Sequence, residues 1–398
     1  MSIKIDDLLK LVTGYGASDL HMKAGALPFM RIGGELLPVV DSVRLTQEDT
    51  LDLAFSMMSN RQKQRFKEFS EVDIAYGVKG VGRFRANIFQ QRGSVGIVMR
   101  VIPDRIRTTS ELGLPPVIEK IASEQRGLIL VTGATGSGKS TTLAAMIDLV
   151  NSTRSGHIVT IEDPIEFLHR DKKSFITQRE VDVDTRSFND ALRAALRQDP
   201  DVILVGEMRD QETITTALTA AETGHLVLST LHTLDAAETI TRIVSTFPPH
   251  QQKSMRIQLA GILKAVISMR LVRAAKGTGR VPAVEVMVTT GLIRDCIINE
   301  EKTSQIRDAL AAGTSQYGMQ TFDQSLFRLF QSELITIDEA LRNATNADEF
   351  KMRVAGILSG DQAIGDLERK NISNVSNAPG EAKDTRHRRE REHTTPAE

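Results

Sequence analysis

The feature that most constrains this chain is a run of small residues, 133–140, that ends in a lysine and a serine. The run fits the pattern G-x-x-x-x-G-K-[ST] without a mismatch. Its residues are Gly133, Ala134, Thr135, Gly136, Ser137, Gly138, Lys139 and Ser140. An apolar run, 128–131, precedes it, and good helix formers follow from Thr141. This context predicts a strand, a phosphate-binding loop and a helix, in that order.

The chemistry of phosphate binding explains these residue types. Glycines let successive backbone N–H groups turn inward around phosphate oxygens, at the positive end of the following helix. Lys139 is expected to reach the β- and γ-phosphates, and the Ser140 hydroxyl is a hard oxygen ligand suited to Mg²⁺. Residues 133–141, Thr141 included, are therefore the predicted binding segment for ATP and Mg²⁺.

Two further apolar runs end in carboxylates. Glu207 follows the run 202–205, and it is the expected Walker B acid, holding Mg²⁺ through water or polarising the attacking water. The run 158–161 is followed by Glu162, Asp163, Pro164 and Glu166. An acid-rich helix start is one interpretation. Because ligands bind at the carboxyl edge of parallel strands, a general base is the sharper hypothesis, with Glu166 preferred and Glu162 kept open.

Two histidines bracket the apolar run 226–231. A single histidine is more often structural than catalytic. His232 lies beside Thr230 and Thr233, and we expect it to sense the γ-phosphate by hydrogen bonding; His225 is the less favoured of the two. A shared metal site is disfavoured because the two histidines lie at opposite ends of one predicted strand.

The pattern along the chain predicts two domains. Residues 1–103 combine a short helix with glycine-separated strands, and a proline-rich linker, 104–118, follows. Short apolar runs then alternate with helical patterns over 119–290, which predicts an α/β class with a buried parallel sheet. From Pro248 onward the pattern is mostly helical, with a late strand at 281–288, and 291–360 form a C-terminal helical region. The tail, 361–398, is predicted to be disordered because it has few large apolar side chains.

Composition narrows the function classes. The chain has 398 residues and a formal net charge of −1, with 4% aromatic residues and no tryptophan, which argues against a nucleic-acid partner. A single cysteine, Cys296, excludes an intrachain disulfide and a four-thiolate zinc site within one chain. The start of the chain does not resemble a secretory signal and no apolar run is long enough to span a membrane, so we expect a cytoplasmic protein.

The order of these motifs resembles that of the secretion-superfamily ATPases, and within them the PilT family of type IV pilus retraction ATPases. The likeness runs from about residue 9 to residue 354. It includes the segments Gly16-Ala17-Ser18-Asp19-Leu20-His21, Gln178-Arg179-Glu180-Val181, Leu196-Arg197-Gln198-Asp199-Pro200-Asp201 and Gly318-Met319-Gln320-Thr321-Phe322-Asp323. The resemblance implies an N-terminal PAS-like domain, a RecA-like ATPase domain and a ring of six copies that retracts pili.

The resemblance also implies partners and further site residues. Arginines of the N-terminal domain complete the nucleotide site in this family, and Arg83, Arg85 and Arg100 match them, with Arg85 and Arg100 preferred. On neighbouring strands they could equally be surface residues. The implied partners are other copies in a homo-hexamer, the inner-membrane platform protein of the pilus and a paralogous retraction ATPase. The implied place is peripheral to the inner membrane, with no nucleic acid and no zinc.

Several alternatives stay open. Pilus-assembly and type II secretion ATPases usually insert a tetracysteine zinc module after the segment matching 270–272, whereas this chain continues through 273–280 without one, which favours retraction. The family's Ala-Ile-Arg-Asn-Leu segment corresponds to Leu292-Ile293-Arg294-Asp295-Cys296, which keeps an accessory PilU-type paralogue open. A non-hydrolysing nucleotide-binding subunit and a RecA-type nucleic-acid translocase are rivals from other classes, and the intact acids argue against the former.

Overall fold

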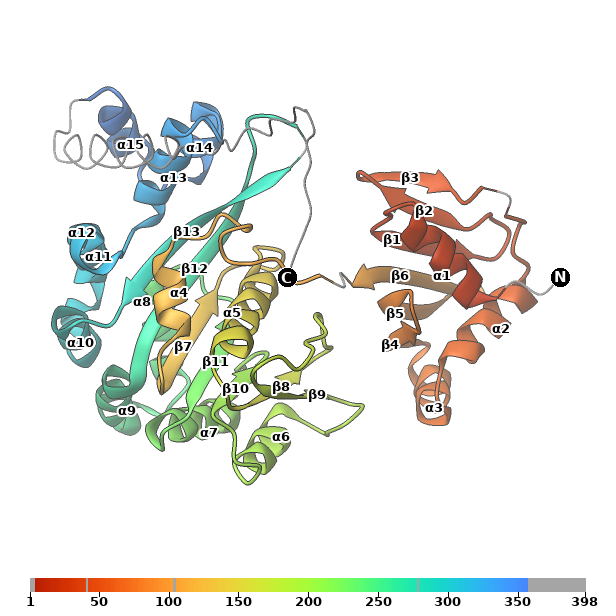
Figure 1. Cartoon of the computed structure of the whole chain (residues 1–398), viewed down its shortest axis with the longest axis horizontal. Coiled ribbons are helices and arrows are strands. Elements are labelled where there is room, and N and C mark those ends of the chain that lie inside the picture. Colours follow the sequence, from red (N-terminus) through yellow and green to blue (C-terminus); the bar gives the residue numbers. More distant parts are fainter. Residues whose placement is uncertain (1–3, 41, 103–104, 278, 357–398) are drawn as a thin grey trace, which may run out of the picture. The chain divides into compact units, whose positions relative to one another are not determined.

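A computed structural model describes residues 4–40, 42–102, 105–277 and 279–356 (Figure 1). The described residues contain two sheets. The first has six strands in the order β3-β2-β1-β6-β5-β4, all paired antiparallel. Its elements are α1 (Ile5–Gly14), β1 (Asp19–Lys23), β2 (Phe29–Ile32), β3 (Glu35–Pro38), α2 (Gln47–Met57), α3 (Asn60–Phe69), β4 (Glu71–Val78), β5 (Gly82–Gln91) and β6 (Ser94–Ile102).

Local sequence signals explain where the first helices begin. The Thr46 hydroxyl accepts a hydrogen bond from the Asp49 N–H at 3.1 Å, and the Asp49 carboxylate accepts one from the Thr46 N–H at 2.8 Å. This reciprocal capping box starts α2. Apolar residues on one stripe of α1, including Leu9 and Val12, are buried in the core of the first sheet. The structure confirms the short helix that the sequence predicts within residues 1–103.

The second sheet has seven strands in the order β13-β12-β7-β11-β10-β8-β9. All pairs are parallel except β12 with β13, which places an antiparallel strand at one edge. The strands are β7 (Gly127–Thr132), β8 (His157–Glu162), β9 (Phe175–Glu180), β10 (Val202–Val205), β11 (Leu226–Leu231), β12 (Leu263–Arg273) and β13 (Arg280–Val288). The helices around them are α4 (Val117–Ala122), α5 (Lys139–Thr153), α6 (Phe188–Ala195), α7 (Gln211–Glu222), α8 (Ala236–Ser245) and α9 (Pro249–Ile262).

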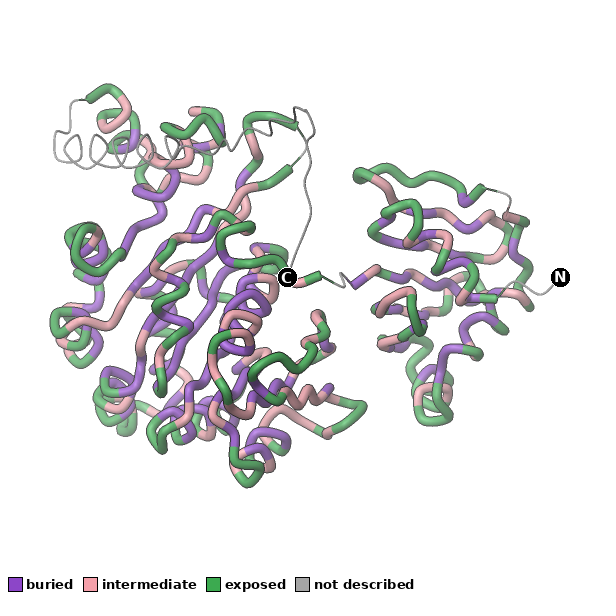
Figure 2. The backbone as a smooth tube through the Cα atoms, viewed as in Figure 1, coloured by how far each residue is buried: buried purple, intermediate pink, exposed green. Residues whose placement is uncertain are grey.

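Helices cover both faces of this sheet. The central strands β7, β10 and β11 are buried along their whole length (Figure 2). Side chains on one face of the strands pack with α4 and α5, and those on the other face pack with α6 to α9. Strands that are buried on both faces have continuous apolar sequences, and for this reason the apolar runs predict these strands. The predicted α/β class with a parallel sheet is confirmed.

One expectation was wrong. The chain after Pro248 was predicted to be mostly helical with one late strand, but residues 263–273 form β12 between β7 and β13. Helix α9 ends at Ile262 and β12 begins at Leu263, so no proline or loop marks the change, and Gly261 lies inside the last turn of the helix. Without such a break, an apolar run cannot be distinguished from a continuing buried helix by its pattern alone.

Helices follow the second sheet. They are α10 (Gly291–Ile298), the 3₁₀ helix η1 (Glu300–Gln305), α11 (Ile306–Ala312), α12 (Thr314–Tyr317), α13 (Phe322–Gln331) and α14 (Ile337–Asn343). Helix α15 (Ala347–Val354) belongs to a separate compact unit that begins at Asn346. The predicted disordered tail, 361–398, lies outside the described residues. None of the helices in the described ranges is both long and apolar enough to cross a membrane.

Candidate nucleotide site

The loop between β7 and α5 has the backbone geometry that the motif predicts. The backbone φ values of Gly133, Gly136 and Gly138 are 137°, 79° and 98°. Residues with a side chain rarely adopt such positive φ values. A Cβ at Gly133 would lie 2.4 Å from the Met269 carbonyl oxygen and 2.7 Å from the Ser137 hydroxyl, so no larger residue fits there. The glycines therefore allow a tight loop directly before the first turn of α5.

Lys139 is the first residue of α5, and its amine lies inside this loop. The Nζ atom donates hydrogen bonds to the carbonyl oxygens of Gly133 at 2.7 Å and Ala134 at 3.1 Å. The residue is only 8% exposed. Burial lowers the pKa of Lys139, and the charges of Glu207 and Glu166 oppose that shift.

The Ser137 hydroxyl is buried with no hydrogen-bond partner in the described structure. A buried polar atom without a partner is costly, and such atoms often mark a ligand. Beside it lie a buried cation and the first backbone amides of α5, which attract anions. These residues fit a ligand rich in acceptor oxygens and negative charge, as a nucleoside triphosphate is.

The two candidate bases have different surroundings. Glu162, the last residue of β8, accepts hydrogen bonds from the Thr160 hydroxyl at 2.8 Å and the Gln178 amide at 3.1 Å. The Glu166 N–H donates to its other oxygen at 3.4 Å. Burial raises the pKa of Glu162, and these hydrogen bonds oppose the shift. The Glu166 residue is exposed. Glu162 is therefore fixed by its neighbours, and Glu166 is accessible to a substrate or water.

Glu207 and His232 lie together at the carboxyl edge of the sheet. Glu207 follows β10, and His232 follows β11, the neighbouring strand. The His232 Nε2 atom is 3.2 Å from the Glu207 Oε1 atom, and the same oxygen pairs with Arg209. His225 precedes β11 at its opposite end and contacts the Ala220 carbonyl oxygen at 2.9 Å. The structure brings His232 to the site and leaves His225 in a local turn.

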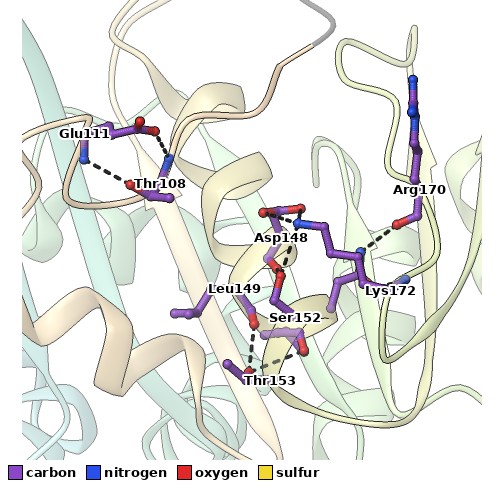
Figure 3. A network of polar contacts seen from close by, with 10 residues as sticks. Thr108, Glu111, Asp148, Leu149, Ser152, Thr153, Arg170 and Lys172 are labelled. Carbon is purple, nitrogen blue, oxygen red and sulfur yellow. Dashed lines mark hydrogen bonds and ion pairs between the residues drawn. The ribbon is translucent and has the colours of Figure 1, made fainter. Parts of the chain in front are cut away.

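A network on α5 fixes the loop that follows Glu166. Lys172 donates to both carboxylate oxygens of Asp148, at 2.7 and 2.8 Å, and to the Ser152 hydroxyl at 3.1 Å (Figure 3). Buried Asn151 donates to the Arg170 carbonyl oxygen at 2.8 Å and accepts from the Lys172 N–H at 3.1 Å. The helix that begins with Lys139 therefore also positions the segment carrying the acids. No motif in the sequence indicated this contact.

Replacing Asn151 with alanine tests this arrangement. The change removes two part-buried hydrogen bonds, to the Arg170 carbonyl and from the Lys172 N–H. We expect the free energy of unfolding to fall by roughly 1–3 kcal/mol, at about 0.5–1.5 kcal/mol for each bond lost. Urea unfolding measures the loss. Ser152→Ala, which removes bonds nearer the surface, should cost less than about 1 kcal/mol. An equal loss in both variants contradicts the role of Asn151.

The predicted arginines lie on β5 and β6. Arg85 and Arg100 are register partners, and their ion pairs are with Asp73 at 3.9 Å and Asp19 at 3.1 Å, acids of the same sheet. Arg83, which was not preferred from the sequence, instead pairs with Glu180, whose carboxylate also accepts the N–H of Ile165 at 3.3 Å. Arg85 still lines a cavity of about 520 Å³ with Asp163 and Arg209.

Comparison with known proteins identifies the class. Residues 5–342 match the family described as Type II/IV secretion system protein, and the chain belongs to that family. It is 47% identical to the type IV pilus retraction ATPase PilT of Pseudomonas aeruginosa, over 87% of this chain and 99% of that protein. Identity to the type IV pilus ATPase PilU of the same organism is 40%, over 88% of this chain and 91% of PilU.

Solved structures agree with this assignment. A crystal structure of the pilus retraction motor PilT with bound ADP has a TM-score of 0.81 and 50% identity, covering 87% of this chain and 98% of that one. The ATPase DotB of Legionella pneumophila has a TM-score of 0.73 and 29% identity, covering 88% and 95%. The predicted resemblance to the PilT family is confirmed, and the chain is a nucleotide-binding ATPase of this family.

Proposed function

We propose that this chain is the ATP-hydrolysing subunit of a motor that retracts type IV pili. The observation that carries the proposal is the amine of Lys139 held inside its glycine loop, near the unpartnered Ser137 hydroxyl. Glu166 and Glu207 follow β8 and β10, parallel strands of the same sheet, so both acids lie at its carboxyl edge. A buried cation with acids at the same edge suits a triphosphate with its metal ion and an attacking water. The identity to PilT, 47% against 40% to PilU, favours the retraction motor over its paralogue.

Residues of the loop have distinct tasks in this proposal. The amides of residues 133–141 and the Lys139 amine bind the phosphates of ATP and offset the negative charge that develops as the terminal bond breaks. Ser140 and Glu207 would hold Mg²⁺, Glu207 through water, and the ion would neutralise charge on the phosphates. Both residues offer the oxygen donors that Mg²⁺ prefers.

The water that attacks the terminal phosphate needs a base. Glu166 is exposed just after the carboxyl end of β8 and accepts the proton from that water, while Glu162 fixes the backbone of Glu166 through its N–H. His232, in contact with Glu207, senses the γ-phosphate. We assign Arg85 and Arg100 to the charge that develops in the transition state. Support for Arg85 comes from the cavity that it shares with Asp163 and Arg209.

The proposed working assembly is a homo-hexamer bound to the inner-membrane platform protein of the pilus, on the cytoplasmic side. A paralogous retraction ATPase is a further proposed partner. Hydrolysis would rotate the N-terminal domain, about 1–103, against the ATPase core, about 119–290, across the segment 104–118. In this account the helical region 291–360 passes the motion to neighbouring copies.

Deletion of the gene in its host tests the direction of the motor. We expect cells with more surface pili than the parent and with no twitching motility, because pili would be assembled and not withdrawn. Electron microscopy and a motility plate provide the two readouts, and restoration by the intact gene is the control. Cells without pili would indicate an assembly ATPase, and near-normal motility would indicate an accessory role of the PilU kind.

A further inference from the structure

Glu285 is a buried carboxylate within an otherwise mostly apolar strand. It lies on β13, opposite Ser268 of β12, and is 6% exposed. A charged group removed from water costs free energy unless it is paired or hydrogen-bonded. The phosphate-binding loop and its neighbouring acids do not include this residue, so its burial requires a separate explanation.

The contact that Glu285 makes is with the first turn of α8. Its Oε1 atom accepts a hydrogen bond from the Ala236 N–H at 3.0 Å, in a buried position. Ala236 is the first residue of α8, and amides at that position have no partner within their own helix. A carboxylate also interacts favourably with the positive end of a helix. Glu285 therefore fixes the start of α8 from a neighbouring strand.

The start of α8 is joined to the nucleotide site by a four-residue loop, 232–235. The loop begins with His232, whose Nε2 atom is 3.2 Å from the Glu207 Oε1 atom. Directly after the loop comes Ala236, whose N–H donates to the Glu285 carboxylate. Within the turn, the Thr233 and Thr239 hydroxyls are 2.6 Å apart, and the Leu234 N–H donates to the Glu238 carboxylate at 2.7 Å. A loop this short and this well bonded transmits the position of α8 to His232.

We infer that Glu285 is a positioning residue for ATP hydrolysis, acting through the first turn of α8 to hold His232 against Glu207. The inference rests on the proposed function of the site. Glu285 would not touch the nucleotide, so its loss should affect turnover much more than nucleotide binding. It also lies where the C-terminal region meets the sheet, since the neighbouring Val286 exchanges two backbone hydrogen bonds with Gln320.

The charges around Glu285 predict a pH dependence. Burial raises the pKa of Glu285 to about 7, and the Asp235 charge adds to the shift, whereas the Ala236 N–H, Arg270 and Arg307 lower it. Arg270 also contacts the Asn343 carbonyl and Phe322, and Arg307 pairs with Asp323. Because the folded pKa lies above the usual value of 4.5, stability from this group is lost as the pH rises from about 4.5 through 7.

Two variants at this position separate positioning from structural support. Glu285→Met removes the acceptor at similar length, and we expect kcat to fall about tenfold or more with KM changed less than about twofold. Glu285→Gln keeps an oxygen that can accept the Ala236 N–H, so it should restore most of kcat. It should also raise the Tm relative to the wild type at pH 8 but not at pH 5. All rates are measured well below the Tm of each variant. Each rate is divided by the concentration of sites that bind nucleotide, so that unfolded protein does not lower the kcat.

Ser187→Ala is the matched control, because it removes the N-cap of α6, a helix that carries no predicted site residue. It should lower the Tm and leave kcat unchanged. A folded Glu285→Met protein with wild-type kcat overturns the inference. Should that variant not fold, an identical pH profile of kcat for Glu285→Gln and wild type overturns it instead. If the wild-type protein hydrolyses no ATP, the proposed function is wrong, and the inference that rests on it is wrong as well.

Discussion

Replacing Lys139 with alanine is expected to lower kcat/KM for ATP by roughly 10³-fold or more while leaving the fold intact. The amine is the only side-chain cation inside the described loop 133–140, and it would offset charge on the phosphates where water is excluded. Burial lowers the pKa of Lys139, which means that the charged amine decreases the free energy of unfolding. We therefore expect the Tm of the variant to be no lower than that of the wild type.

Phosphate release by the purified full-length protein measures this effect, together with binding of a fluorescent nucleotide. Lys173→Ala is a suitable control because Lys173 is an exposed lysine on a different loop of the same domain. It should keep the wild-type rate. Turnover by the Lys139→Ala protein at the wild-type rate would remove the assignment of residues 133–141 as the hydrolytic site.

Glutamine at position 166 should have the second largest effect. Glu166 is exposed and its N–H is held by Glu162, and a positioned general base contributes roughly 10²–10⁴ in rate. Glu166→Gln keeps the size of the side chain and removes its basicity. We expect kcat to fall by that factor while ATP affinity stays within about threefold, since the phosphate contacts come from other residues.

The same substitution at Glu162 provides the comparison. Glu162 accepts from Thr160 and Gln178, and a glutamine there would place one NH₂ group where an acceptor is needed. We expect Glu162→Gln to lower the Tm and to reduce kcat by no more than about tenfold. Rapid-mix measurement of the single-turnover rate separates the two variants. A larger loss of rate at Glu162 than at Glu166 would reverse their roles.

The parts of the site that the sequence predicted are those formed by neighbours along the chain. The phosphate loop, the acids after β8 and Glu207 after β10 each follow a continuous apolar run, and a parallel sheet brings the ends of its strands to one edge. The order of the strands was not needed for this. The sequence does not decide between Glu162 and Glu166, because the choice depends on Gln178, which reaches Glu162 from β9.

The parts that were missed depend on contacts distant in the sequence or on a missing boundary signal. Asn151 fixes a loop about 20 residues later through two backbone groups. Every residue type has such backbone groups, so the sequence of the loop does not indicate the contact. Glu285 interrupts an apolar strand, and its partner is a helix amide 49 residues earlier. Strand β12 begins where α9 ends, so the pattern of its apolar run predicts more helix.

Imaging of single pili on living cells shows whether ATP hydrolysis at residues 133–141 drives pilus retraction. The host gene is replaced by one encoding Lys139→Ala, and labelled pili are followed in time beside cells with the wild-type gene. We expect pili on the variant cells to extend and then stay extended, while wild-type pili shorten. Pili that shorten at the wild-type speed in the variant cells would contradict it.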